Sequence, residues 1–356
     1  MFSVEKFIHE NLAKRFPSLK KYGKILYLRE FMRKNFIGER ILVSRRGVKE
    51  LIEGVPEVIS LKTKKAAMEV VAKAIDDIRI GKVLELNPVK KVVKDMVEEA
   101  LTNYQWAMLS LIKIRSFDKY TFTHSVNVAL LSIIIGIELK FNRDELNRLA
   151  LGAILHDLGK INIDHSILIK PGPLNEEEFA QIRKHPLDGY QMLPFDSGGA
   201  KMARTIAKQH HERENGTGYP EGLIGNQIDE FAAIVAVADV YDALTTDRPY
   251  RNRLLPYEAM KTIIAMSGSG FRKKIAGALL SAMAIYPQGS FVRLNTGEIA
   301  MIIRPNRRAI LRPAIRLLVD AEGRSFRESV DVDLLTQPNR YITGYVDEEV
   351  FQRAVV

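Results

Sequence analysis

The distribution of hydrophobic and polar residues divides the chain into a long helical part and a short β-rich tail. From about residue 105 to residue 285, apolar residues recur at three- and four-residue spacing, the period of an amphipathic helix. This spacing predicts helices over residues 126–139, 145–156, 176–193, 200–211, 234–244 and 256–265. Asn175 followed by Glu178 has the pattern of a capping box, which marks a helix start. This part is expected to be an all-α domain.

After residue 286 the helical spacing of apolar residues gives way to short β-type runs. Short runs rich in β-branched residues occupy residues 291–294, 299–303 and 315–319, and turn-forming sequences at 295–297 and 321–323 separate them. The pattern predicts a small β-rich domain over residues 286–356.

The first hundred residues gather no side chains of catalytic type. Their patterns indicate helices over residues 26–36 and 66–80, a strand over 40–44, and a long helix from 89 to 114 that leads into the next domain. Three regions are therefore expected: a helix-rich N-terminal regulatory or sensory region of unknown type (1–100), a helical domain (101–285) and the β-rich extension (286–356). The fold class is mainly α.

The composition restricts the chemistry that a functional site can use. The 356 residues include no cysteine, which excludes disulfides and thiolate metal sites. A metal site must then use His, Asp and Glu, donors that suit a hard or borderline catalytic ion. A reducing cytosol fits this composition, and the N-terminus shows no signal-peptide cleavage site. A cytoplasmic location is expected.

Net charge and hydropathy limit the classes of partner. The formal net charge of +10 suits anionic ligands. No aromatic residues are interleaved with the basic clusters, so a solvated lysine-rich surface is favoured over a nucleic-acid platform. The longest apolar run, residues 128–137, is shorter than the roughly 20 residues that a membrane-spanning helix needs. Neither nucleic-acid binding nor a transmembrane segment is expected.

Candidate chemistry begins with two adjacent histidines, His210 and His211, that run into the turn Gly216-Thr217-Gly218-Tyr219-Pro220. Imidazoles are common metal ligands, and glycine permits a positive φ or a close approach by a neighbour. Taken alone, the segment is either an exposed loop or half of a metal site.

Further ligand-type residues occur at helix ends of the same domain. They are His124 at the start of an apolar helix, the pair His156-Asp157 at a helix end, His185 before Pro186, and Asp239 within an apolar helix. A buried carboxylate is costly unless it is paired or bound to a metal. Each residue alone could be a cap or a packing residue, but all histidines except His9 and His165 fall in this pattern, which indicates one shared site.

The order of these residues closely resembles the HD-GYP family of phosphohydrolases. Segments 170–174, 238–244 and 248–251 also match the family, and the resemblance covers about residues 105–285. It implies that residues 101–285 form an HD-type helical bundle that hydrolyses cyclic di-GMP to pGpG and/or GMP by a metal-bridged hydroxide. The tail is similar to a β-rich extension often found after this domain.

The resemblance also implies roles for individual residues. One metal would be held by His124, His156, Asp157 and Asp239. Asp157 would bridge to a second metal held by His185, His210 and His211. The metals would be two divalent transition ions, most often iron or manganese. Asp157 and Lys160 would be catalytic, and substrate would contact Lys160, Arg248, Arg251, Gly218 and Tyr219. The Gly-Tyr-Pro loop would be a contact surface for diguanylate-cyclase domains, and a homodimer is possible.

Departures from the family pattern refine these expectations. Tyr120 occupies the position where some members have a glutamate that binds a third metal, so two metals are predicted. Asn215 replaces a common aspartate, and His165 is expected to be exposed and not a ligand. Two alternatives stay open: a catalytically weak cyclic-dinucleotide sensor or cyclase-docking module, and a phosphodiesterase for another cyclic dinucleotide or for a nucleoside phosphate.

Overall fold

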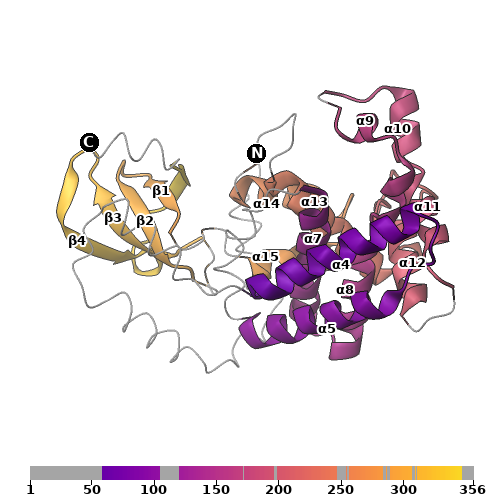
Figure 1. Ribbon diagram of the computed structural model, residues 1–356. Helices are drawn as coiled ribbons and strands as arrows, with labels where there is room; N and C mark the ends of the chain where they lie inside the picture. Colours follow the sequence, from indigo (N-terminus) through magenta and orange to yellow (C-terminus); the bar gives the residue numbers. More distant parts are fainter. Residues whose placement is uncertain are drawn as a thin grey trace. The chain divides into compact units, whose positions relative to one another are not determined.

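The computed structural model describes residues 58–104, 120–170, 172–195, 199–246, 254, 256–283, 286, 289–306, 309 and 311–346. They lie in two compact units, the helical unit Glu57–Met283 and a unit that contains the C-terminal strands (Figure 1). The predicted helix at 26–36 and strand at 40–44 lie outside the described residues, as does the end of the predicted helix 89–114. The mainly α fold with a small β-rich extension is confirmed.

The core of the helical unit is built on α7 (Tyr120–Glu138) and α13 (Glu230–Thr245), which pack against each other. Both helices are apolar on nearly all sides, as a fully surrounded helix must be. Around them lie α8 (Arg143–Leu155), which packs on α7 and on α12 (Ala200–Gln209), and α14 (Pro256–Ala265) and α15 (Lys273–Ala282). All of these helices except α15, which was not predicted, match the predicted ones closely.

The predicted single helix over 176–193 is wrong. The structure has α10 (Glu176–Ile182) and α11 (His185–Met192), separated by a turn at Arg183 and Lys184. Pro186 is the reason, because proline lacks an amide hydrogen and is tolerated only in the first turn of a helix. The predicted capping box of Asn175 and Glu178 is confirmed, with both reciprocal hydrogen bonds at 2.8 Å.

The helical unit begins well before residue 101, the predicted domain boundary. Helices α4 (Leu61–Arg79) and α5 (Leu86–Asn103) pack on each other, α4 also packs on α7, and α5 packs on α7 and α8. Their apolar faces supply the contact: Ala67 and Val71 of α4 are buried, as are the apolar side chains along α5. Helices α4 and α5, which precede residue 101 or span it, therefore share the core of the helical unit.

Two glycines allow elements near the site to approach closely. Gly152 of α8 faces Ile206 of α12, and a Cβ at Gly152 would lie 2.2 Å from the Ile206 Cδ1. Gly159 lies in the short helix η4 (Leu158–Asn162), where a Cβ would lie 2.0 Å from the carbonyl oxygen of His185. At Gly159 the clash would be with main-chain atoms, so only glycine fits there, whereas at Gly152 the side chain of Ile206 would have to shift. The short helices α9 (His165–Leu168) and η5 (Gly225–Gln227) complete the described helical unit.

The second unit contains a five-stranded antiparallel sheet in the order β4-β3-β2-β1-β5. Its strands are β1 (Phe291–Leu294), β2 (Ile299–Arg304), β3 (Ala314–Val319), β4 (Ser325–Asp333) and β5 (Ile342–Tyr345), with η6 (Leu334–Thr336) after β4. Strand β5 returns to pair with β1. The predicted strands are confirmed. None of the described helices is both long and apolar enough to cross a bilayer.

Candidate metal centre

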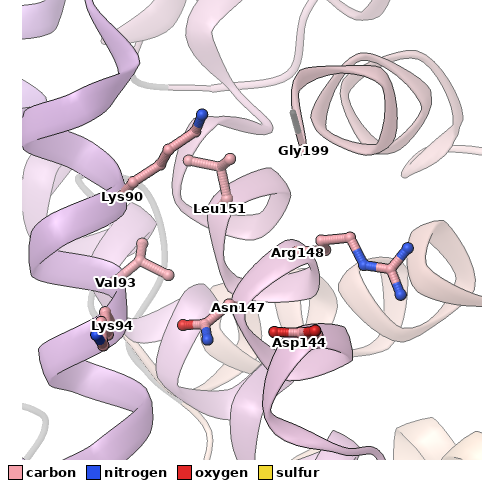
Figure 2. A pocket seen from close by; sticks show the side chains of 8 residues that line it. All are labelled: Lys90, Val93, Lys94, Asp144, Asn147, Arg148, Leu151 and Gly199. Carbon is pink, nitrogen blue, oxygen red and sulfur yellow. The ribbon is translucent and has the colours of Figure 1, made fainter. Parts of the chain in front are cut away.

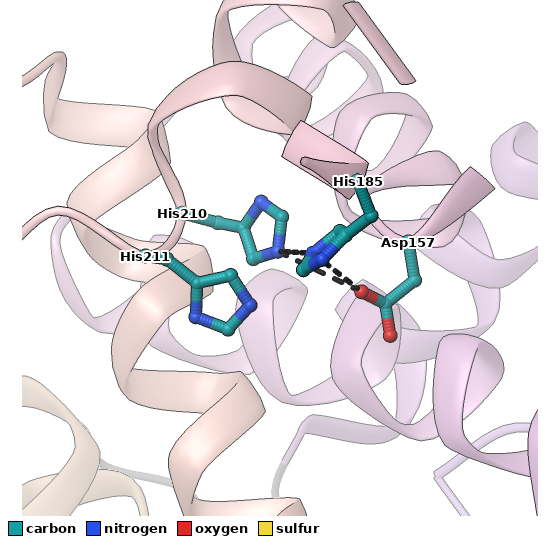
Figure 3. Close-up of side chains that lie close together, drawn as sticks. All are labelled: Asp157, His185, His210 and His211. Atoms are coloured by element: carbon teal, nitrogen blue, oxygen red, sulfur yellow. Dashed lines mark hydrogen bonds and ion pairs between the residues drawn. The ribbon is translucent and has the colours of Figure 1, made fainter. Parts of the chain in front are cut away.

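The structure brings the predicted ligand residues together at the ends of several helices. His156 follows α8, His185 begins α11, and His210 and His211 follow α12. His124 and Asp239 come from α7 and α13. His156, His185 and His210 have no exposed surface. Figure 3 shows Asp157 and the imidazoles of His185, His210 and His211 gathered from separate helices.

Asp157 lies at the middle of this cluster, and its two carboxylate oxygens face different partners. Oδ2 lies 3.5 Å from His124 Nε2 and 3.4 Å from His156 Nε2. Oδ1 lies 3.4 Å from His185 Nε2 and 3.7 Å from His210 Nε2. Each oxygen therefore points at a separate pair of imidazoles, which is the arrangement of a carboxylate that bridges two sites.

Main-chain carbonyl groups fix the orientation of three imidazoles. Nδ1 of His156 lies 2.7 Å from the carbonyl oxygen of Ala153, and Nδ1 of His185 lies 2.7 Å from that of Ile182. Nδ1 of His210 lies 2.9 Å from the carbonyl oxygen of Ala207. A carbonyl oxygen can only accept, so each Nδ1 must donate. In the neutral ring this leaves the Nε2 lone pair directed into the cluster, as metal-ligating histidines are usually held.

The inward-facing atoms lack partners that could satisfy them. Nε2 of His185 and Nε2 of His210 are 3.3 Å apart, and both are acceptors in the neutral rings. Among the described residues, the buried His156 Nε2 and Asp157 Oδ1 make no hydrogen bond. Buried polar atoms without partners are costly and rare. A cation between these atoms would satisfy all of them at once.

Electrostatics keep the carboxylates ionised. Burial would raise the pKa of Asp157, but His156, Lys160 and His124 hold it well below its usual range. Burial acts in the same direction on Asp239, and its hydrogen bond and charge interaction with His124 likewise hold its pKa well below normal. Two buried carboxylates stay negative, and the charge of a metal would balance them.

The imidazoles of His185, His210 and His211 are held neutral. Burial lowers the pKa of His185 to about 3 and lowers the pKa values of His210 and His211. Burial also opposes protonation of His124, but its hydrogen bonds to nearby carboxylates raise its pKa well above the ordinary value. With no metal, a protonated His124 supplies the positive charge that these carboxylates attract. Deprotonated carboxylates and neutral imidazoles are the forms that bind metals.

The donor atoms fall into two groups that meet at Asp157. Asp157, His185, His210 and His211 form one, and His124, His156 and Asp157 form the other, with the ligand atoms of each group within 4.8 Å of one another. Asp239 Oδ1 lies 3.2 Å from His124 Nε2, beside the second group. These oxygen and nitrogen donors fit divalent metals of intermediate softness.

Asp242 supports the centre, although the sequence interpretation gave it no role. Its Oδ2 lies 2.7 Å from His124 Nδ1, and its Oδ1 accepts a hydrogen bond of 2.9 Å from Asn127. It thereby orients His124 as the carbonyl groups orient the other rings. The available signal was its spacing, because residues three apart on α13 share a face, and Asp239 precedes it by three.

Replacing Asp242 by asparagine is expected to weaken metal binding and turnover by about 10–100-fold, the usual effect of removing a partner of a ligating histidine. An amide at this position loses the negative charge and cannot accept from both His124 and Asn127. Metal titration of the variant, with turnover measured at saturating metal, checks this. Asp229→Asn, at the cap of the same helix, is the control. Unchanged metal affinity in Asp242→Asn would contradict the orienting role.

The Gly-Tyr-Pro loop is held against the histidine pair by backbone contacts. A Cβ at Gly218 would lie 2.5 Å from the carbonyl oxygen of His211, so this glycine allows the close approach. The buried carboxylate of Glu212 accepts hydrogen bonds from the amides of Glu221 and Leu223, at 2.7 and 3.0 Å. Glu212 is the anchor of the loop, a role that the sequence did not reveal.

Tyr219 and Lys160 each contact a different residue of the ligand cluster. The ring of Tyr219 stacks on His211 with centroids 4.7 Å apart. Lys160 donates to Asp157 Oδ2 at 2.5 Å, and about a third of its side chain is exposed. His165 is exposed, as predicted. Arg248 and Arg251 lie outside the described residues, as does the side chain of Tyr120.

The sequence matches the profiles of two known domain families. Residues 110–275 match the sequence profile of the HD domain, and residues 291–354 match that of a KOW domain associated with the HD domain. The chain contains an HD domain. HD domains bind divalent metals, and the His/Asp cluster of this HD domain fits one. The family predicted from the motifs is confirmed at this level.

The chain is similar to several proteins that are named phosphodiesterases. It is 33% identical over 277 residues to a cyclic di-GMP phosphodiesterase of Pseudomonas aeruginosa, covering 77% of this chain and 66% of that protein. It is 40% identical over 154 residues to a 3'3'-cGAMP-specific phosphodiesterase of Vibrio cholerae, covering 43% of this chain and 36% of that protein. The chain thus spans about two-thirds of the first relative and about a third of the second.

A solved structure of an HDG"Y"P protein from Bdellovibrio bacteriovorus shares the fold. Its TM-score is 0.51 at 24% sequence identity, and the likeness covers 66% of this chain and 77% of that one.

Proposed function

We propose that the HD domain hydrolyses cyclic di-GMP to pGpG and/or GMP with two divalent transition ions, iron or manganese. The observation that carries the proposal is the placement of Asp157, whose two oxygens face separate groups of buried imidazoles. The relative from Pseudomonas aeruginosa, named a cyclic di-GMP phosphodiesterase, supports the choice of substrate.

The proposed chemistry divides between the ions and the side chains of this chain. Two bound divalent metals would lower the pKa of a water and neutralise charge on the phosphate. Asp157 would contribute one carboxylate oxygen to each of the two ligand groups and so fix their positions relative to each other. Lys160, which is partly exposed beside Asp157, would offer its ammonium group to a phosphate oxygen. Tyr219 would cover His211 and shape the rim. Arg248 and Arg251 remain predicted phosphate contacts, and Gly218 a predicted substrate contact.

Incubation of the metal-loaded chain with cyclic di-GMP tests the activity. We expect pGpG, GMP or both to accumulate, separated and quantified by chromatography. Absence of both products with iron and with manganese would refute the enzyme and favour the sensor or cyclase-docking alternative. Parallel reactions with 3'3'-cGAMP address a second substrate, which the relative from Vibrio cholerae makes worth testing. A higher kcat/KM for 3'3'-cGAMP would replace cyclic di-GMP as the proposed substrate. Docking of cyclase domains and homodimer formation stay predictions.

Removal of the metal is expected to abolish turnover reversibly. Dialysis against a chelator should leave the helical unit folded, since its core is apolar. Adding two equivalents of iron or manganese should restore activity, because the donors form two groups. Elemental analysis and circular dichroism check these points. Activity in the metal-free chain would contradict the proposal, and a third tightly bound ion would contradict the two-metal prediction from Tyr120.

A further inference from the structure

The short helix α10 lies at the edge of the helical unit and buries none of its side chains (Figure 1). Its largest apolar residue, Phe179, is 38% exposed. A single exposed apolar side chain is ordinary on a protein surface. The surroundings of Phe179 therefore decide whether it has a function, and two of its neighbours connect it to the metal centre.

The first neighbour is Tyr219, the ring that stacks on His211 with centroids 4.7 Å apart. Phe179 meets Tyr219 edge to face, with centroids 6.3 Å apart and an angle of 78° between the ring planes. The aromatic rings thus form a continuous series from His211, a predicted metal ligand, out to the exposed surface of α10.

The second neighbour is Arg183, which follows α10 and precedes His185 by two residues. Its guanidinium carbon lies over the ring of Phe179, 4.4 Å from the centroid, and 5.9 Å from that of Tyr219. Arg183 is exposed. Among the described residues no carboxylate pairs with it, whereas Glu178 of α10 pairs with Lys170 at 2.6 Å. An aromatic ring and an unneutralised guanidinium are therefore presented together.

This pair of side chains has the chemistry of a nucleobase contact. Bases stack on aromatic rings and on guanidinium planes, and the positive charge of arginine strengthens the contact. The proposed function places a phosphate of the substrate at the ligand cluster, and each base is joined to its phosphate through one ribose. A base of that substrate would lie beside the rim that Tyr219 forms, where Phe179 and Arg183 are exposed.

The groove of about 620 Å³ between α5 and α8 does not offer this combination (Figure 2). Its Arg148 guanidinium points away from Lys90 and Lys94 and lies over the ring of Phe231, 5.9 Å from the centroid. The apolar side chains of its wall are almost fully buried. The residues that line it include no aromatic ring, and their cations do not converge.

We propose that Phe179 and Arg183 bind a nucleobase of the substrate by stacking, beside the metal centre. The inference rests on the proposed function, because a dinucleotide substrate supplies the base. It adds to that function two substrate-binding residues on α10 and at its end, outside the ligand cluster.

Calorimetric titration of the manganese-loaded full chain with GMP and with ribose 5-phosphate tests the base contact. Both probes carry a 5'-phosphate on ribose, so the ratio of their dissociation constants reports the base. We expect GMP to bind at least about fivefold more tightly, as stacking of one base predicts. Phe179→Ala should bring the ratio to within about twofold of one. No binding of GMP, equal binding of both probes, or an unchanged ratio in Phe179→Ala would overturn the inference.

Further variants separate stacking from packing against Tyr219. Phe179→Tyr keeps the ring and should keep the ratio, whereas Phe179→Leu keeps an apolar side chain and should lose it. Arg183→Gln should lower the ratio by about twofold or more, the usual effect of losing an exposed cation–π contact. Lys184→Gln makes the same charge change one residue further on and should leave the ratio unchanged. Full retention of the ratio in Phe179→Leu, or equal lowering in Arg183→Gln and Lys184→Gln, would refute the stacked contact.

Turnover of cyclic di-GMP distinguishes this inference from the proposed function. Phe179→Ala should raise KM by about fivefold or more with kcat within about twofold, since stacking holds substrate and transition state alike. Its metal content should be unchanged. Hydrolysis with an unchanged KM in this variant would refute the base contact and leave the proposed function standing. No hydrolysis by the unaltered chain would refute the proposed function, while the ratio for GMP would still decide the base contact.

Discussion

Asp157→Ala is expected to abolish hydrolysis and the binding of both metals while the helical unit stays folded. Asp157 is the residue with one oxygen toward each ligand group, so its loss removes a donor from both groups together. We expect turnover to fall by at least about 10³-fold, since both the metals and their charge stabilisation are lost. The apolar core around Ile154 and Leu155 is unaffected.

Elemental analysis, circular dichroism and product formation test the Asp157 variant together. Asp95→Ala is the matched control, because Asp95 is an exposed aspartate on α5 far along the chain from the ligand residues. It should retain both metals and full turnover. Two metals retained in Asp157→Ala would show that the assignment of Asp157 as the bridging ligand is wrong.

Gly159→Ala should damage both stability and the metal centre. The added Cβ would lie 2.0 Å from the carbonyl oxygen of His185 and 2.5 Å from the amide nitrogen of Gly189. Because both are main-chain atoms, η4 and α11 must separate. We expect a loss of about 3 kcal/mol or more in the free energy of unfolding. For a domain of this size, that lowers Tm by about 6–12 °C. Metal affinity should fall too, since Asp157 immediately precedes η4 and His185 begins α11.

Gly277→Ala is the control for this substitution. Gly277 lies within α15, and a Cβ there would meet no atom within 4 Å. Alanine in a helix interior is more favourable than glycine by roughly 0.5–1 kcal/mol, so this variant should be slightly stabilised. Thermal unfolding followed by circular dichroism compares the two variants. Equal melting temperatures for both would contradict the importance of the close contact at Gly159.

The helices of the core could be predicted because their own sequences determine them. Residues 126–139 and 234–244 are apolar at helical spacing, and the structure has α7 and α13 over them. The break between α10 and α11 was missed because the apolar period continues across Arg183 and Lys184, while Pro186 imposes a new start. Local composition identified β1, β2 and β3 for the same reason as the core helices, whereas β4 and β5 were not predicted.

The geometry of the candidate metal centre was harder to predict from the sequence than the core helices. The ligand residues were found by resemblance and by their positions at helix ends, but their mutual orientation depends on contacts between distant segments. The bond between His124 and Asp242 joins residues 118 positions apart, and the three-residue spacing of Asp239 and Asp242 was the one local signal for it. The anchoring of the loop by Glu212 was hidden for the same reason, because its partners are main-chain amides that carry no sequence signal.

The bonds from Nδ1 to carbonyl groups link the cluster to the way helices end. The last carbonyl groups of a helix have no partner within it. Here the carbonyl oxygens of Ala153, Ile182 and Ala207, each near the end of a helix, accept from an imidazole three residues further on. Each ring is thus aimed by a local bond that forms when its helix forms. Because the rings are already arranged, loading of the proposed metal ions is expected to need no refolding step.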